Sequence, residues 1–165
     1  MLYLPNFPAH EFNLTKFGGE DWWPKMSRKV LESLQAVRNF HGQPVSISPH
    51  KAALGRRNGP ASASDHNIDR WGEVRCADVF PANVSTPDDA RKFVDMAFRA
   101  GFNSVGVYPH WRNGRGQQQC GFHLGFRPDA TRNATWGFVR ETLHGPQRMV
   151  GMEEALSLVG SPIPS

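Results

Sequence analysis

Residues 104–126 read SVGVYPHWRNGRGQQQCGFHLGF, and their pattern gives the clearest indication of the fold. From Ser104 to Tyr108, the residues alternate in the two-residue period of a strand. Residues 109–119 are polar and include two glycines, which is typical of a turn region. Gly121 to Phe126 then indicates a returning strand. The sequence therefore predicts a hairpin with a long tip.

Helices and strands are also expected before this hairpin. Pro24 to Phe40 places apolar side chains at three- and four-residue steps and predicts an amphipathic helix. Short strands are expected over Pro44–Ile47 and over Val74–Phe80. A helix is expected from Ser85 to Gly101, because Thr86 is a suitable cap and is followed by proline and two carboxylates.

The C-terminal part is expected to be helical, over Trp136–Leu143 and Met152–Val159. A chain of 165 residues is the size of one ordinary domain. We therefore expect a single domain over residues 1–165, in which residues 137–165 form a C-terminal extension packed on the rest.

Composition limits the classes of partner. The formal charge of +4 and the pI near 9.4 favour an acidic partner, such as nucleic acid, anionic lipid or an anionic cell wall. Basic residues are scattered apart from Arg56-Arg57, so no nucleic-acid partner is expected. The apolar runs fall far short of the roughly 20 residues that span a bilayer, so no membrane insertion is expected. Cys76 and Cys120 are too few for a disulfide framework, and whether they are bonded stays open.

Two histidines and an aspartate form the candidate metal site. Asp78 lies inside a predicted strand, where an aspartate needs a partner. His66 ends a loop and His123 lies on the last strand of the hairpin, so separate elements can bring the three residues together. Two imidazoles and one carboxylate are a common catalytic zinc set that leaves a fourth position open for water.

These residues lie in a series of short motifs. The series comprises Leu34 to Arg38, Gly42-Gln43-Pro44-Val45, Ser48-Pro49, Ala52-Ala53-Leu54, Ser64-Asp65-His66, Ala77-Asp78, Val105-Gly106-Val107-Tyr108-Pro109 and Gly121-Phe122-His123. In order and approximate spacing, it resembles the zinc D-Ala-D-Ala peptidase family, which includes phage endolysins, and is most similar to the small YcbK-like branch. The resemblance covers about Phe7 to Trp136.

The resemblance implies an α+β fold, with helices around a small, mainly antiparallel sheet and a zinc site in a surface cleft. It implies that His66, Asp78 and His123 hold Zn²⁺. It also implies a peptidase that hydrolyses amide bonds in the stem peptides of bacterial peptidoglycan, which would be the main partner. Ser64 and Tyr108 are expected to contact the substrate.

Three departures from the family pattern bear on catalysis. His66 and Asp78 are further apart than usual, so residues 67–73 look like an inserted loop. Cys120 stands where many members have an acid or histidine as general base, and Gly125 stands where the nearest branch commonly has aspartate. The arginine that grips a substrate carboxylate is missing from its usual segment, here residues 45–50.

Replacements for the missing groups are therefore needed. We expect His110 to be the general base, since it follows Tyr108-Pro109 at the start of the hairpin tip, with Cys120 as second candidate. Arg57 is our candidate for binding substrate, with Arg56 and Arg75 as alternatives, because a guanidinium can bind a carboxylate from several approaches. These arginines could equally be surface charge.

Two other functions compete with the peptidase. One is a non-catalytic, zinc-stabilised wall-binding or virion structural module with the same fold. The other uses Cys120 as a nucleophile and His123 as its base, which leaves His66 and Asp78 without roles. Met1 to Pro5 lacks the features of a signal peptide. We therefore expect a phage product: an endolysin made in the host cytoplasm and released to the wall, or a virion part among other virion proteins.

Overall fold

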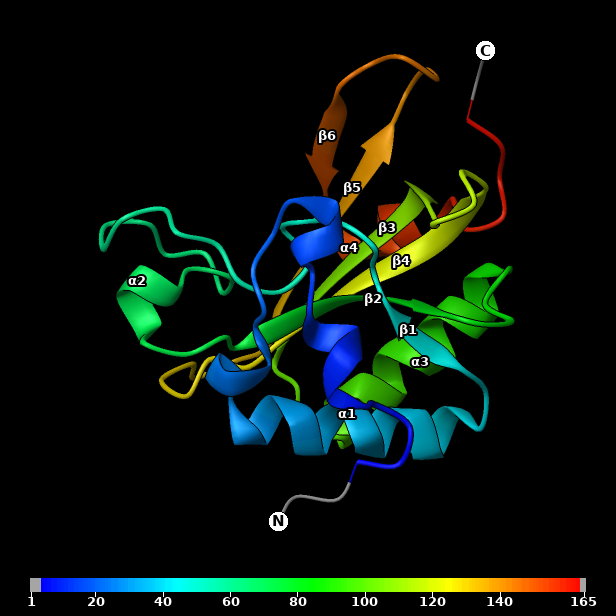
Figure 1. Cartoon of the computed structure of the whole chain (residues 1–165). Coiled ribbons are helices and arrows are strands. Elements are labelled where there is room, and N and C mark those ends of the chain that lie inside the picture. The colour runs from blue at the N-terminus through cyan, green and yellow to red at the C-terminus, as the bar shows by residue number, and fades with distance from the viewer. Residues whose placement is uncertain (1–3, 164–165) are drawn as a thin grey trace.

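The computed structural model describes residues 4–163 and arranges them as one six-stranded sheet with helices packed around it (Figure 1). Residues 1–3, part of the segment inspected for a signal peptide, lie outside the described residues. The strands are β1 (Val45–Ile47), β2 (Cys76–Pro81), β3 (Ser104–Arg112), β4 (Gln118–Gly125), β5 (Ala134–Arg140) and β6 (Gln147–Val150). The helices are α1 (Arg28–His41), α2 (Ile68–Trp71), α3 (Pro87–Arg99) and α4 (Met152–Ser157), with short 3-10 helices at Ala9–Phe12, Thr15–Phe17 and Trp23–Lys25.

The predicted hairpin is confirmed as β3 and β4, which pair antiparallel with a register shift between Tyr108 and Trp111. Its long tip is wrong, because residues 109–112 and 118–119 lie in the strands and only residues 113–117 connect them. The strand order is β1-β2-β4-β3-β5-β6. Among the described strands, β3 and β5 are the one parallel pair. The expected α+β class with a mainly antiparallel sheet is therefore confirmed.

Helix α3 lies where its sequence indicates, whereas α1 begins at Arg28 rather than at the expected Pro24, which lies in the 3-10 helix Trp23–Lys25. Gly42 ends α1 with a positive φ of 69°, a conformation that costs glycine little. At the start of α3, Thr86 and Asp89 form a capping box, each accepting a backbone N–H of the other. Both helices lie on the same side of the sheet (Figure 1).

The two faces of the central strands have different contents. Alternate residues of β3 and β4 such as Val105, Val107 and Phe122 are fully buried, and the ring of Phe122 lies 4.7 Å from that of Phe93 on α3. The intervening residues, among them His123, face the opposite side. One face of the sheet therefore makes the core with the helices, and the other is left for polar side chains.

The expected helix over Trp136–Leu143 is wrong, because the chain forms strand β5 there. Trp136 and Phe138 lie on one face, while Gly137 and Val139 lie on the other against α4, so the period is that of a strand. The helix predicted from Met152 is confirmed as α4. Residues 137–150 thus widen the sheet itself. Within residues 4–163, no helix is long and apolar enough to span a membrane.

Gly137 allows α4 to pack closely on β5. A Cβ at Gly137 would lie 2.2 Å from the Cβ of Ala155. We therefore expect Gly137→Ala to lower the free energy of unfolding by about 1–3 kcal/mol, the usual cost of overpacking a core. Urea unfolding measures this cost. Gly151→Ala is the matched control, because nothing lies within 4 Å of its Cβ position; equal stability of the two variants would contradict close packing of α4.

Candidate metal centre

His66 is held by a loop that pairs with itself. The Arg56 amide donates to the His66 carbonyl at 2.7 Å, and the Ile68 amide donates to the Arg56 carbonyl at 3.0 Å. The Asn67 side chain donates to the carbonyls of Gly59 and Ser62, both at 2.7 Å. The extra residues between His66 and Asp78 thus fold as an ordered turn and helix α2 rather than as a loose insertion.

Asp78 and His123 are brought together by the sheet. They are direct partners in the antiparallel register of β2 and β4. Asp78 Oδ1 lies 3.0 Å from His123 Nδ1 and 3.4 Å from His66 Nε2. The two imidazole nitrogens are 3.1 Å apart. Three donor atoms from three separate elements therefore form a compact triangle.

The triangle has the dimensions of a metal site. Bonds of about 2.0–2.2 Å to one tetrahedral ion hold the ligand atoms about 3.3–3.6 Å apart, close to the distances found here. His66 Nδ1 contacts the Leu54 carbonyl, which fixes the ring and directs Nε2 toward Asp78. All three side chains are buried. These residues could hold one metal ion.

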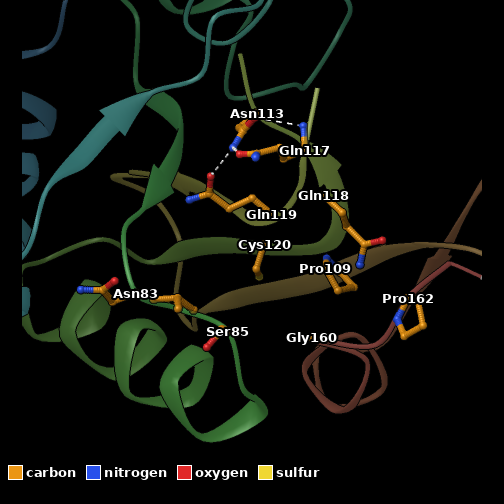
Figure 2. A pocket seen from close by; sticks show the side chains of 11 residues that line it. Asn83, Ser85, Pro109, Asn113, Gln117, Gln118, Gln119, Cys120, Gly160 and Pro162 are labelled. Atoms are coloured by element: carbon orange, nitrogen blue, oxygen red, sulfur yellow. Dashed lines mark hydrogen bonds between the residues drawn. The ribbon is translucent and has the colours of Figure 1, made fainter. Parts of the chain in front are cut away.

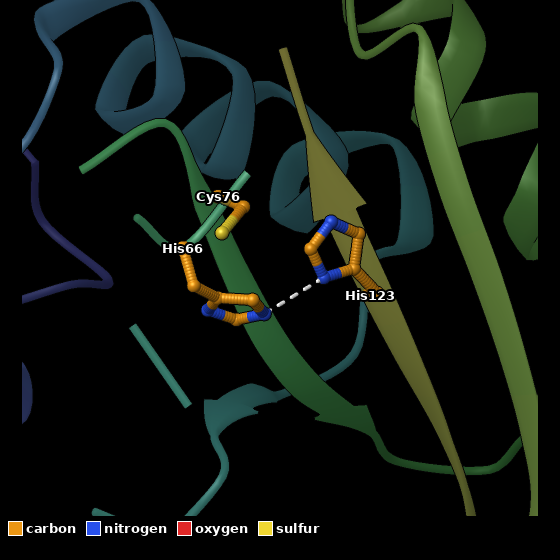
Figure 3. A group of neighbouring side chains, drawn as sticks. All are labelled: His66, Cys76 and His123. Atoms are coloured by element: carbon orange, nitrogen blue, oxygen red, sulfur yellow. Dashed lines mark hydrogen bonds between the residues drawn. The ribbon is translucent and has the colours of Figure 1, made fainter. Parts of the chain in front are cut away.

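Cys76 is a fourth donor near the two histidines (Figure 3). One ligand atom from each of His66, Cys76 and His123 lies within 4.8 Å of the others, so this buried group could also hold a metal ion. Cys76 Sγ, however, lies 3.8 Å from the Leu54 carbonyl, which also contacts His66 Nδ1. Burial, together with the nearby Asp78 and Asp65 charges, raises the pKa of the Cys76 thiol. The shorter distances favour Asp78 as the third ligand.

Asp65 supports His123 from behind. Its carboxylate contacts His123 Nε2 at 3.2 Å and accepts hydrogen bonds from Arg127 Nε at 2.7 Å and Ser104 Oγ at 2.6 Å. Burial alone would raise the pKa of Asp65, but these three partners hold it well below its usual range. A Cβ at Gly125 would lie 2.9 Å from both Asp65 Oδ2 and His123 Nε2. Asp65 thus fills the space that an aspartate at position 125 would need.

The charges of the group attract one another strongly. Burial by itself would lower the pKa of His123, but hydrogen bonds from its ring to Asp65 and Asp78 outweigh burial and raise it to about 9. Burial would raise the pKa of Asp78, whereas the two histidines lower it. The two carboxylates therefore stay ionised and favour positive charge at the centre of the triangle.

A pocket of about 330 Å³ opens beside this group. Its lining consists of the metal group, aromatic side chains and polar side chains: Arg56, Ser64, Asp65, His66, Asp78, Tyr108, Trp111, His123, Arg127, Trp136, Phe138 and Gln147. The expected substrate-binding residues Ser64 and Tyr108 both line it. Burial raises the pKa of Tyr108, so its hydroxyl, which accepts a hydrogen bond from Trp136 Nε1, stays protonated.

The other residues singled out from sequence lie elsewhere. His110 is not among the residues that line this pocket; its Nδ1 accepts the Arg140 amide at 3.0 Å, and its buried Nε2 has no partner among the described residues. Cys120 lines a different pocket with Pro109 and Pro162 (Figure 2). Arg57 lies outside the metal pocket and pairs with Glu20 and Asp69. Both cysteines are free and buried.

Substitution can decide between the two donor sets. We expect Asp78→Ala to lose bound metal as His66→Ala and His123→Ala do, while Cys76→Ala retains it, because Asp78 completes the shorter triangle. Elemental analysis of the purified variants measures this. With Co²⁺, a sulfur-to-metal charge-transfer band that disappears in Cys76→Ala would instead make the thiol a ligand and overturn the assignment.

Asp65 should set the metal affinity through His123. We expect Asp65→Ala to weaken metal binding by about 10–100-fold, the usual effect of losing such a partner. Competition with a chromophoric chelator measures the affinity. Adding Gly125→Asp to Asp65→Ala should not restore it, because a Cβ at position 125 would lie only 2.9 Å from His123 Nε2 and would clash with the ring. Wild-type affinity in Asp65→Ala would show that His123 needs no carboxylate behind it.

Comparison of this chain with family models, with curated proteins and with solved structures finds no match, so the geometry of the site is the basis for its interpretation.

Proposed function

We propose that this protein is a zinc-dependent peptidase that hydrolyses amide bonds in the stem peptides of bacterial peptidoglycan, encoded by a phage as an endolysin or virion component. One observation carries the proposal: His66 Nε2, Asp78 Oδ1 and His123 Nδ1 lie 3.0–3.4 Å apart beside a pocket. Two imidazoles and one carboxylate form a ligand set typical of hydrolytic zinc sites. The motif resemblance supports the choice of substrate.

The residues of the pocket have distinct roles in this proposal. His66, Asp78 and His123 hold the zinc, and Asp65 orients His123. A bound zinc ion polarises a carbonyl and lowers the pKa of its water toward about 7. Arg56 and the protonated Tyr108 hydroxyl line the same pocket and can donate hydrogen bonds to a peptide carbonyl. Trp111, Trp136 and Phe138 provide apolar contact and limit access of water.

The lack of a free proton acceptor in this pocket favours a second, non-catalytic function. Among the described residues that line it, the only carboxylates and imidazoles are the three metal ligands and Asp65. Asp65 already has three partners, so the pocket offers no free group to accept a proton from water. This supports the alternative of a non-catalytic, zinc-stabilised module that binds the wall or belongs to a virion.

Digestion of purified peptidoglycan separates the two functions. We expect the zinc-loaded protein to release soluble muropeptides and a chelator to stop this release, with added Zn²⁺ restoring it. Mass spectrometry identifies the bond that is cut. His123→Ala should be inactive, whereas Cys120→Ser should keep wild-type turnover, because Cys120 lines a different pocket. Wall binding without any new chain ends, at full zinc occupancy, would favour the non-catalytic module.

A further inference from the structure

A second pocket, of about 360 Å³, adjoins the metal pocket. The two share four lining residues, Arg56, Asp78, Trp111 and Gln147. They are therefore two halves of one groove, which we call the metal half and the arginine half. The arginine half is completed by Ser48, His50, Phe80, Arg112 and Arg140.

The arginine half carries guanidinium groups with spare hydrogen-bond donors. Arg56, Arg112 and Arg140 each donate to one backbone carbonyl, at 3.2, 2.8 and 2.6 Å. None of the three forms an ion pair with a described carboxylate. Arg57 and Arg148, outside the groove, each pair with two carboxylates. The groove arginines are thus anchored in place with positive charge left uncompensated.

The acidic content of this half is small. Asp78 is the only carboxylate among its lining residues, and that carboxylate already faces His66 and His123. The aromatic rings of Phe80 and Trp111 lie 5.9 Å apart and provide an apolar surface beside the charges. A surface of this kind suits a peptide that carries carboxylates, because guanidinium binds carboxylate in a bidentate, charge-assisted way.

We propose that the arginine half is a subsite for carboxylate groups of a peptide whose amide bond lies in the metal half. This rests on the proposed peptidase function and narrows its substrate class to stem peptides with free carboxylates rather than carboxamides. Arg56 lies where the two halves meet, and Arg112 and Arg140 lie in the arginine half alone. The carboxylate can belong to an acidic side chain or to the C-terminus of the peptide.

Binding of defined peptides tests the subsite without relying on turnover. The probe is the tetrapeptide L-Ala-γ-D-Glu-L-Lys-D-Ala, titrated calorimetrically into the zinc-saturated full chain. Forms amidated at the glutamate carboxyl, at the C-terminus or at both distinguish the two sources of carboxylate. We expect amidation of the recognised carboxyl to weaken binding about tenfold or more, the scale of a charge-assisted pair. Double amidation should weaken binding at least as much.

Arginine variants show whether the groove arginines cause the difference in affinity between free and amidated peptides. Arg112→Gln and Arg140→Gln together should reduce the difference between free and amidated peptides to about twofold or less, with zinc content unchanged. Arg115→Gln is the matched control, because Arg115 lies on the same hairpin tip but lines neither half. Thermal unfolding checks that each variant is folded; if the double variant is not, Arg112→Gln alone serves, and it should reduce the difference at least threefold.

The outcomes separate this proposal from the peptidase assignment. Equal binding of the free and doubly amidated peptides, binding of neither, or a difference that persists in the arginine variant overturns the subsite. If the protein still cleaves peptidoglycan in that case, the peptidase assignment is retained and only the carboxylate subsite is rejected. Selective, arginine-dependent binding with no turnover of any wall substrate supports the subsite and rejects the peptidase.

Discussion

The register between β2 and β4 is the constraint on which the site depends. It sets Asp78 directly opposite His123, so that Asp78 Oδ1 and His123 Nδ1 lie 3.0 Å apart. Because side chains alternate along a strand, a slip of one residue would turn His123 toward the helices and bring Phe122 to the polar face. Burial of Phe122 against Phe93 opposes that slip. The hydrophobic core therefore determines the geometry of the candidate metal site without contacting it.

Glycines on the polar face give the site its space. A Cβ at Gly106 would lie 2.7 Å from the Trp136 ring, and one at Gly121 would lie 2.2 Å from the Trp111 ring. Gly125 leaves room for the Asp65 carboxylate in the same way. Three glycines on neighbouring strands thus let two indole rings and a buried acid approach the backbone closely. The role of these glycines could not be predicted from the sequence, because the side chains that fill the space beside them come from distant segments.

Patterns within one element were predictable, and contacts between distant segments were not. The hairpin and the capping of α3 follow from period and order, and the convergence of His66, Asp78 and His123 was expected from the motif resemblance. The alternation of a strand also places Cys120, three residues before His123, on the opposite face, and the same rule identifies β5 from Trp136 to Val139. By contrast, no sequence pattern indicated a role for Asp65. The sequence also could not distinguish Arg56 from Arg57, because only the folded loop places Arg56 in the groove and pairs Arg57 with Glu20.

Metal binding and catalysis make different demands on this pocket. The first needs donor atoms at fixed distances, and the triangle with Asp65 behind it meets that demand. The second also needs a place for the proton that leaves water. Arg127 compensates Asp65, so the charges directed into the groove are Asp78, the unpaired arginines and, in the proposed enzyme, the zinc ion. Their sum is positive, which stabilises negative charge on a carbonyl oxygen and draws in carboxylates, but it also makes nearby groups poorer proton acceptors. The metal half holds no free proton acceptor, and the one further imidazole of the groove, that of His50, lies in the arginine half. The proposed enzyme would therefore have to derive its rate mainly from electrostatic stabilisation.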